Sequence, residues 1–444
     1  MNKSKLIVSA FLMIAQFSSA QDASFTLEAA KSYAQVHNIS VVNADHDITD
    51  AKERANEVRA VGLPQISITG NFGQNITLPV QVLDASFFNP NAPEGELVSF
   101  RAGTNFSSSA GLTANQLLFN GSYFIGLKAA AYFAKFQETA SDLTKEDVSY
   151  NVIQAYQLAS VAKENISFVD SMVVAAKSMV EMQAIYFDLG LLLKEDMDQL
   201  KYSLLTAKQA QLSSTIQYEN ALNLLKYSMG YPINDPIAIT QTPDELLTIS
   251  SLAGGDIHSN LSFELIQKQI VLSELNLKNN KMAIIPTLGA YYQQSYTALR
   301  NEFNFFDSDK QWFLQNGWGL QLNVPVFAGG KKNALVQQAR IRLLKDENSL
   351  IQMESALTMQ EIQAKNNLRG AQSKMDLQKE NIDFAKSIYE NSVVKDQIGE
   401  GSSMAVTQKY NQLIIAQSQY LAAKIDLFQA QLELNKIYNN ILDK

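Results

Sequence analysis

Residues 118–121 read Leu-Phe-Asn-Gly, and residues 326–329 read Val-Phe-Ala-Gly, 208 positions further on. Similar pairs lie to either side of these two stretches. They are Asn-Ile-Ser at 38–40 with Asn-Leu-Ser at 260–262, Leu63-Pro64 with Ile285-Pro286, and Gly190 with Gly399. Self-similarity at a nearly fixed spacing is the mark of a duplicated unit. We therefore predict two halves with the same order of elements.

Long helices follow each of the two glycine-containing stretches. Proline is excluded from helix interiors, and residues 94–231 and 326–444 contain none. Small and apolar residues repeat at spacings of four and three in the first half, as in helices that pack in a coiled coil. This seam consists of Val148, Val152, Ala155, Ala159, Ala162, Ile166, Val169, Val173, Ala176 and Val180. A weaker heptad in the second half consists of Leu343, Leu350, Leu357, Ala364 and Ala371. A helix over 122–187 would be about 100 Å long.

The segments between the helices change to a period of two, which predicts strands. We place them near 64–77, 104–119, 286–297 and 312–327, each with one apolar and one uncharged polar face. Such strands suit a transmembrane barrel, and a soluble β-sandwich is the alternative. Four strands cannot close a barrel, whereas three chains would supply twelve. The fold class expected is a mixed α and β membrane protein, in which a trimeric 12-stranded β-barrel continues into a long α-helical barrel.

Composition narrows the classes of function. Lys3 and Lys5 precede an apolar run to Phe17 and a small-residue site at 18–20, so residues 1–20 read as a signal peptide. The chain has no cysteine, which excludes disulfides and thiolate chemistry. Its formal charge of −8 argues against nucleic acid as a partner.

Taken in order, these features resemble TolC-type outer-membrane efflux proteins over nearly the whole mature chain. The resemblance implies a homotrimer in the outer membrane with a large periplasmic portion. It also implies partners, namely a periplasmic adaptor (membrane fusion) protein and an inner-membrane pump of the resistance-nodulation-division or ABC type. The expected function is a passive duct for efflux or type I secretion. The expected divisions are a first repeat at 21–230, an equatorial linker at 231–259 and a second repeat at 260–444.

The helical pattern resumes after Gly190 and after 399–401, which predicts return helices near 194–230 and 403–442 and so one long helical hairpin with a glycine tip in each half. In the resembled family the tips of the helical hairpins bind the adaptor. The matching residues are Leu189, Gly190, Leu191 and Leu192, then Ile398, Gly399, Glu400 and Gly401. The glycines are also expected for a plain turn, because glycine readily adopts the positive φ that ends a helix. The leucines suit either a contact surface or local helix packing.

The pore constriction of the best-studied relatives uses an Asp-x-x-Asp pair after the second tip. Here the matching residues are Ala405 and Gln408, so the sequence departs from that pattern. Asp196 and Asp198 follow the first tip and are the alternative candidates. They also suit ordinary carboxylates at a helix N-terminus, where the helix dipole favours them.

No catalytic set, cofactor motif or metal site is predicted. Three histidines are spread along the chain, and His46, between Asp45 and Asp47, lacks a second histidine on its turn. Two other functions compete with the duct. One is a structural or adhesive periplasmic coiled-coil protein, and the other is a periplasmic enzyme, which would need an active site that the sequence does not show.

Overall fold

The computed structural model describes residues 23–249 and 254–442, and the predicted signal peptide lies outside them. The chain forms two compact units. The helical unit contains residues 23–44, 141–249, 254–262 and 354–442, and the sheet unit contains 45–140 and 263–353. Each unit therefore draws on both sequence repeats. The helices α2 (Ile39–Ala60), α3 (Gly121–Asp188), α6 (Leu261–Met282) and α7 (Lys331–Gln397) run through both units.

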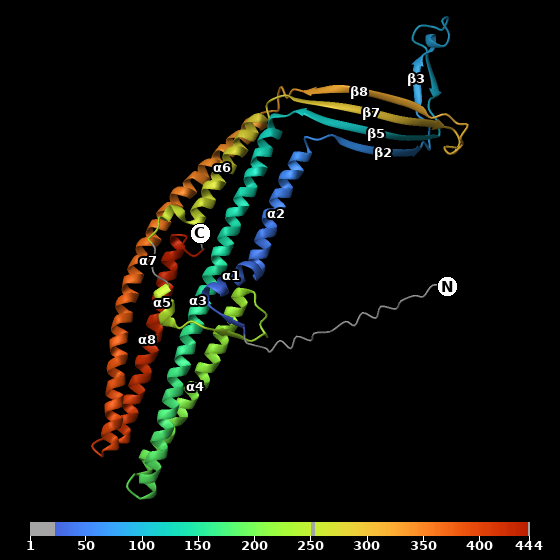
Figure 1. Cartoon of the computed structure of the whole chain (residues 1–444). Coiled ribbons are helices and arrows are strands. Elements are labelled where there is room, and N and C mark those ends of the chain that lie inside the picture. The colour runs from blue at the N-terminus through green and yellow to red at the C-terminus, as the bar shows by residue number, and fades with distance from the viewer. Residues whose placement is uncertain (1–22, 250–253, 443–444) are drawn as a thin grey trace, which may run out of the picture. The chain divides into compact units, whose positions relative to one another are not determined.

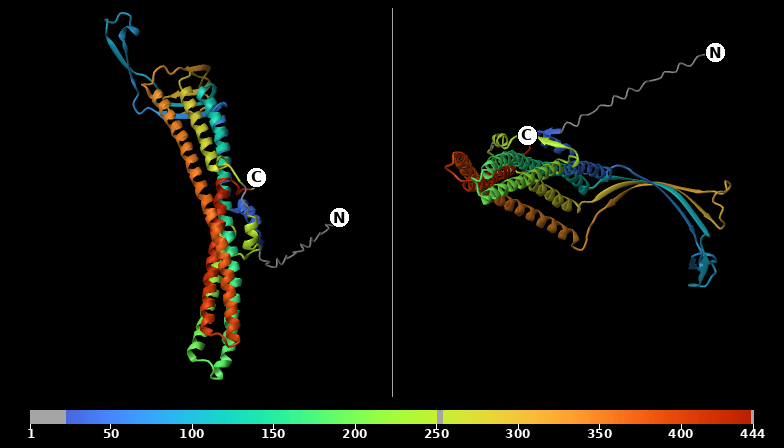
Figure 2. Two further views of the ribbon diagram at one scale, coloured as in Figure 1. Left: turned by 90° about the vertical axis from the view of Figure 1, so that its left-hand side faces the viewer. Right: turned by 90° about the horizontal axis from the view of Figure 1, so that it is seen from below.

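Two helical hairpins make up most of the helical unit. In the first, α3 is followed by α4 (Lys194–Met229), and in the second, α7 is followed by α8 (Ser403–Ile437). The two hairpins lie side by side in this unit (Figure 2). α3 has 68 residues and α7 has 67. No helix in the described part of the chain is long and apolar enough to cross a membrane.

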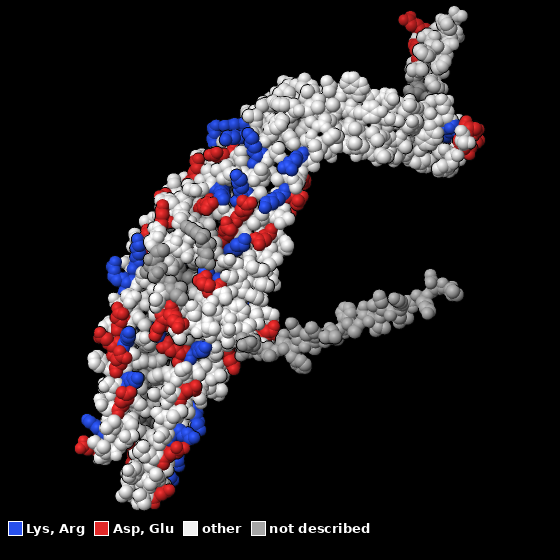
Figure 3. All heavy atoms as spheres, in the orientation of Figure 1, with Lys and Arg blue, Asp and Glu red and all other residues white. Residues whose placement is uncertain are grey.

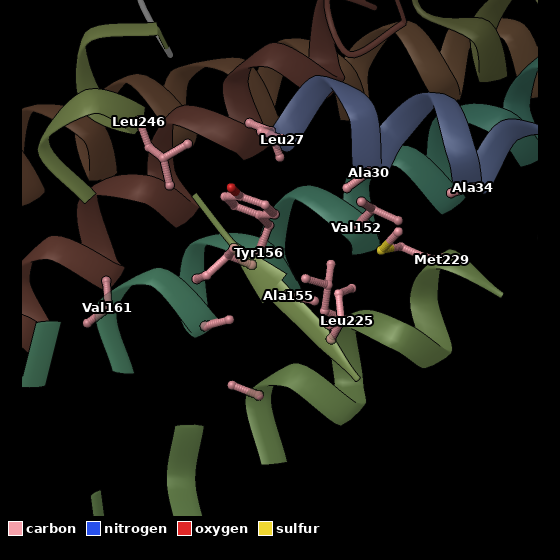
Figure 4. Packing of buried hydrophobic residues seen from close by; sticks show 14 of the residues in the cluster. Leu27, Ala30, Ala34, Val152, Ala155, Tyr156, Val161, Leu225, Met229 and Leu246 are labelled. Atoms are coloured by element: carbon pink, nitrogen blue, oxygen red, sulfur yellow. The ribbon is translucent and has the colours of Figure 1, made fainter. Parts of the chain in front are cut away.

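The core of the helical unit forms around the predicted seam of α3. Val152, Ala155 and Ala159 are at most 1 % exposed, and Tyr156 of the same helix is fully buried among them. Side chains from α1 (Leu27–His37), α4 and the short helix α5 (Pro243–Ile249) pack against this seam (Figure 4). Alanine and valine at the seam let the neighbouring backbones approach closely, so one stretch of α3 can hold three other elements.

A small parallel sheet joins the start of the described chain to the middle linker. β1 (Ala23–Phe25) pairs with β6 (Ile237–Ile239). The phenol of Tyr156 donates to the carbonyl of Phe25 at 2.8 Å, and Lys163 Nζ donates to the carbonyl of Ile239 at 2.9 Å. α3 thus positions both strands. The sequence did not predict β1 and β6, because a strand of three residues is too short to show a period-two pattern.

Asn38 and Asn260, which occupy equivalent positions in the two repeats, make equivalent hydrogen bonds. Asn38 Oδ1 accepts the backbone N–H of Ser40, and Asn260 Oδ1 accepts that of Ser262. Each side-chain amide also donates to the end of the return helix of its own half, at Ser228 O of α4 and Ile437 O of α8. The duplication seen in the sequence is therefore present at the level of single hydrogen bonds.

The sheet unit contains one antiparallel four-stranded sheet in the order β2-β5-β7-β8 (Figure 1). Its strands are β2 (Gln65–Gln74), β5 (Phe106–Phe119), β7 (Thr287–Arg300) and β8 (Phe313–Asn323). Within this sheet β2 and β8 are edge strands. A separate two-stranded β-hairpin, β3 (Val80–Asp84) with β4 (Leu97–Arg101), lies in the chain segment between β2 and β5. It lies within residues 75–105, to which the sequence assigned no element.

The register of the sheet places its apolar side chains on one face. Ile68 pairs with Leu112, and Tyr292 of β7 pairs with Trp318 of β8. Ile68 is 78 % exposed and Trp318 is 77 % exposed. The four strands carry a single charged residue, Arg300, and their surface in Figure 3 is correspondingly almost free of charge. A soluble sandwich would cover this face, whereas no second sheet packs on it among the described residues.

A buried lysine joins three elements of the helical unit. Lys424 of α8 is fully buried; its Nζ contacts Glu164 of α3 at 2.8 Å and Asp244 of α5 at 3.0 Å, and it lies over the ring of Tyr420. Burial lowers the pKa of Lys424, but the hydrogen bonds to the two carboxylates outweigh burial, so its pKa is raised. The lysine therefore stays charged and links both hairpins to the linker helix.

Replacing this lysine tests its contribution to stability. Lys424→Met leaves Glu164 without its partner in a half-buried position, which we expect to cost about 2 kcal/mol after allowance for solvent screening. The apparent melting temperature of the detergent-solubilised protein should fall by several degrees. The matched control is Lys374→Met, which removes an exposed ion pair with Asp426 at the same 2.7–3.0 Å range of distances. Equal losses in both variants would contradict a special role for the buried lysine.

Candidate functional site: the tips of the two helical hairpins

The two tips share one backbone motif. Gly190 has φ +74° and Gly399 has φ +78°, the left-handed conformation expected at a helix C-terminus. The N–H of Leu191 bonds to Tyr186 O at 2.8 Å, and the N–H of Glu400 bonds to Lys395 O at 2.9 Å. These bonds satisfy carbonyls at the ends of α3 and α7 that would otherwise lack partners. The need for a turn at each helix end is therefore sufficient to explain the backbone conformation of Gly190 and Gly399.

The first tip exposes leucines to solvent. Leu189 is 67 % exposed, Leu191 is 72 % and Leu193 is 71 %, while Leu192 is half-buried. Local packing does not account for the three exposed side chains. Burying each of them in a partner would be favourable by about 1.5–3 kcal/mol, before the costs of association.

The second tip is smaller and more polar. Ile398 is 63 % exposed, and Gly399, Glu400 and Gly401 are exposed as well. A Cβ atom at Gly401 would lie 2.8 Å from the backbone nitrogen of Asp396, so only glycine fits there. Ser402 caps α8 by accepting the N–H of Ala405. The tip is thus a tight turn that presents one apolar and one acidic side chain.

The four candidate constriction residues lie in the first turns of the return helices. Asp196 is half-buried and Asp198 is exposed on α4, whereas Ala405 is half-buried and Gln408 is exposed on α8. No hydrogen bond or ion pair in the described part of the chain joins Asp196 or Asp198 to the second hairpin. Asp196 lies in the first turn of α4, where the helix dipole favours a carboxylate.

The structure reveals a link between the hairpins that the sequence did not indicate. Gln183 of α3 is 7 % exposed, and its amide donates to Asp396 Oδ2 of α7 at 2.8 Å. The bond joins residues 213 positions apart. Gln183 lies about two helical turns before Gly190, and Asp396 lies about one turn before Gly399. Neither residue stands out in the sequence, because a glutamine on a long polar helix is ordinary.

Next to this link, the four helices share an apolar cluster. Its buried members are Ala207, Tyr389, Val406, Tyr410 and Leu413. The rings of Tyr389 and Tyr410 lie 6.1 Å apart, and the buried hydroxyl of Tyr410 has no hydrogen-bond partner among the described residues. Burial raises the pKa of Tyr410 to about 12. The hairpins are therefore held together near the tips by one hydrogen bond and a compact apolar contact.

The described residues contain no group of His, Cys, Asp and Glu side chains that could hold a metal ion. His46 is exposed on α2.

Comparisons with known proteins agree with the architecture. Residues 272–440 match the family described as outer membrane efflux protein. The chain is 20 % identical over 409 residues to the outer membrane protein TolC of Salmonella enteritidis, covering 90 % of this chain and 79 % of that protein. The resemblance to TolC-type outer-membrane efflux proteins is confirmed. The predicted location in the outer membrane, with a large periplasmic portion, agrees with these matches to efflux proteins.

Two further relatives extend the comparison with the efflux family. The chain is 21 % identical over 203 residues to the proteases secretion protein PrtF of Dickeya chrysanthemi, covering 44 % of this chain and 43 % of PrtF. Among solved structures, the CusC channel aligns with a TM-score of 0.73 at 15 % identity and covers 93 % of this chain and 91 % of that chain. At this identity the structural likeness shows that the two chains share a fold.

The link between the tips can be tested by distance measurements. Gln183→Ala removes a hydrogen bond to a carboxylate, worth about 1–2 kcal/mol, and should let the two tips separate. Because the chain lacks cysteine, spin labels can be attached through Asp188→Cys and Gln397→Cys at the ends of α3 and α7. We expect a longer and broader distance distribution in labelled protein diluted with unlabelled protein.

Gln211→Ala is the matched control for this experiment. Gln211 donates to Asp170 Oδ1 at 2.7 Å, but this bond joins α3 and α4 within one hairpin. The control should leave the distance between the tips unchanged. Identical distributions for Gln183→Ala and the unmutated protein would show that the link does not hold the tips.

Proposed function

We propose that the chain is one subunit of a trimeric outer-membrane channel that exports small molecules or proteins delivered by an inner-membrane pump. The observation that carries the proposal is the four-stranded sheet, which has an exposed apolar face, two edge strands and a single charged residue, Arg300. Backbone groups at a strand edge cannot stay unpaired in hydrocarbon. Pairing β8 of one copy with β2 of the next would satisfy them.

Three copies would close the barrel. Twelve antiparallel strands lie within the range of bacterial outer-membrane barrels and leave room for a water-filled lumen. Two copies would give eight strands, whose interior is filled by side chains. The hairpins of the three copies would form the periplasmic helical barrel, with the repeats 21–230 and 260–444 as its duplicated halves and 231–259 as the equatorial linker.

The tips are proposed as the site where the periplasmic adaptor binds. Leu189, Leu191 and Leu193 are exposed apolar side chains grouped on one turn, and grouped exposed apolar residues are a feature of protein interaction surfaces. The constriction is assigned to Asp196 and Asp198 on the first hairpin together with Ala405 and Gln408 on the second. A threefold ring of Asp196 would favour cations.

Efflux of drugs and toxic compounds, and type I secretion of proteins, are both compatible with this duct. Support for export comes from the match to outer membrane efflux proteins and from the relative PrtF, which is named for the secretion of proteases. A passive duct performs no chemistry, so the energy would come from the partner pump.

The oligomer and its conductance test the channel directly. We expect the full-length protein, extracted in detergent, to run as a trimer and to give discrete conductance steps in planar lipid bilayers. Leu320→Lys should abolish insertion into lipid, because a charge on the lipid-facing side near the bilayer centre costs about 2–4 kcal/mol. Gln321→Lys, one residue away on the opposite face, is the control that should still insert. A soluble monomer would refute the proposal.

Contact between tip and adaptor can be tested by crosslinking. Leu191→Cys and Glu400→Cys should form crosslinks to the adaptor in cells, and Leu191→Asp should lower the amount of adaptor that co-purifies by about tenfold, because an unpaired charge would replace an apolar anchor. Leu212→Cys and Leu212→Asp are matched controls at a position that is 63 % exposed on α4, away from the tip. Equal crosslinking from both positions would argue against a site at the tips.

A further inference from the structure

A buried glutamate lies on α3 at a place that the export function does not explain. Glu146 is 1 % exposed, and neither of its carboxylate oxygens has a hydrogen-bond partner among the described residues. An ionised carboxylate in such a place is strongly disfavoured unless it is paired. Glu146 therefore has either to hold a proton or to find a counter-charge.

Three elements lie against this turn of α3. Lys436 of α8 bonds to Asp147 Oδ1 at 2.7 Å and lies 4.9 Å from the ring centre of Tyr150. Gln35 of α1 bonds to Ser149, and Val41 of α2 packs in the same core as Val148. Glu146 is therefore enclosed within the joint between the start of the chain, α3 and the end of α8.

The charged groups that face this joint are mostly engaged elsewhere. On α1, Lys31 is paired with Glu28, and His37 is stacked on Tyr33. The part of α2 in the helical unit, residues 39–44, carries no charge. On α8, Glu433 adds negative charge near Tyr150, and Lys436 is the cation that acts on Glu146. Lys436 is already paired with Asp147 at 2.7 Å.

We propose that Glu146 is a proton-binding site that fastens the last turn of α8 to α3 when it is protonated and loosens this joint when it is ionised. The proton neutralises the carboxyl and leaves Lys436 on Asp147. Loss of the proton creates a buried charge with no hydrogen-bond partner among the described residues. Such a charge is stabilised when water reaches it, so ionisation of Glu146 favours opening of the packed joint between α3 and α8.

The joint reaches beyond the two helices. The carbonyl of Ile437 accepts Asn260, and the carbonyl of Tyr438 accepts Ser259 Oγ at 2.9 Å. Asn439 donates back to Ser259 O at 3.1 Å. A shift at the end of α8 would therefore reach the linker residues that begin the second repeat. A change of pH that titrates Glu146 would therefore affect the residues at the junction between the two repeats.

The electrostatics place the switch near neutral pH. Burial raises the pKa of Glu146 to about 7, while Lys436 lowers it and Asp147 raises it. The folded chain thus binds this proton more tightly than the unfolded chain, whose carboxyl has its ordinary value of 4.5. The stabilisation is complete below pH 4.5 and is lost as the pH rises through 7.

The protonation state can be measured directly. Infrared difference spectra between the full-length protein and Glu146→Gln, recorded from pH 4 to pH 9, should show a neutral carboxyl band that disappears with a midpoint near 7. A midpoint near 4.5 would overturn the proposal. Glu181→Gln is the matched control, because Glu181 lies on the same helix with its side chain 68 % exposed.

The loosening needs its own readout. Amide hydrogen exchange of residues 430–442, corrected for the intrinsic effect of pH, should become at least about threefold faster at pH 8.5 than at pH 6. Glu146→Gln and Glu146→Leu should both abolish this difference, and either suffices if the other does not accumulate. An unchanged pH response in both variants would refute the switch, whether or not the protein proves to be an export channel.

Discussion

The burial of small side chains along α3 is the constraint on which the helical unit depends. A helix of 68 residues has no compact shape of its own, and its hydrogen bonds alone do not fix its neighbours. Val152, Ala155 and Ala159 present almost no bulk, so α1, α4 and α5 can pack against one stretch of helix. Tyr156 and Lys163 then bond to the backbones of Phe25 and Ile239, which positions β1 and β6. The start of the chain and the middle linker are thereby attached to the same helix.

The two repeats make equivalent hydrogen bonds at Asn38 and Asn260 but differ in the side chains at their hairpin tips. Asn38 and Asn260 make the same pair of hydrogen bonds, one to the following helix and one to the return helix of the same half. The tips share a backbone turn and differ in side chains, since one exposes leucines and the other exposes Ile398 and Glu400. The two tips therefore offer different side chains to a partner, apolar in the first half and mixed apolar and acidic in the second.

Charge is distributed unequally between the parts of the chain. The four strands of the sheet carry one charged residue, whereas the helices carry ion pairs along their length and a buried lysine, Lys424, between the hairpins. An uncharged sheet suits a low-dielectric surrounding, since a charge there would lack solvation. In the helical unit, two buried ionisable side chains lie where helices meet. Lys424 is paired with a carboxylate, whereas Glu146 has no hydrogen-bond partner among the described residues.

The sequence by itself determined the features that repeat. Period-two alternation predicted one apolar face for each strand, and the paired register of the strands places Ile68 and Trp318 together on one face of the sheet. The heptad seam at Val152 and Ala155 predicted which side of α3 is buried, and Gly190 and Gly399 predicted where the chain turns. These features follow from local periodicity and backbone conformation, which the order of residues encodes. The hairpin β3–β4 and the strands β1 and β6 escaped notice because they are too short to show a period.

Only the tertiary structure decided which residues meet across the hairpins. The bond from Gln183 to Asp396, the pairing of Lys424 with Asp244 and the enclosure of Glu146 all join positions far apart in the chain. Each depends on how two long helices are rotated about their axes. An ideal helix drifts by about 20° per heptad relative to a strict seven-residue repeat, so over many heptads the facing residues are set by the packing itself and not by the pattern of one helix.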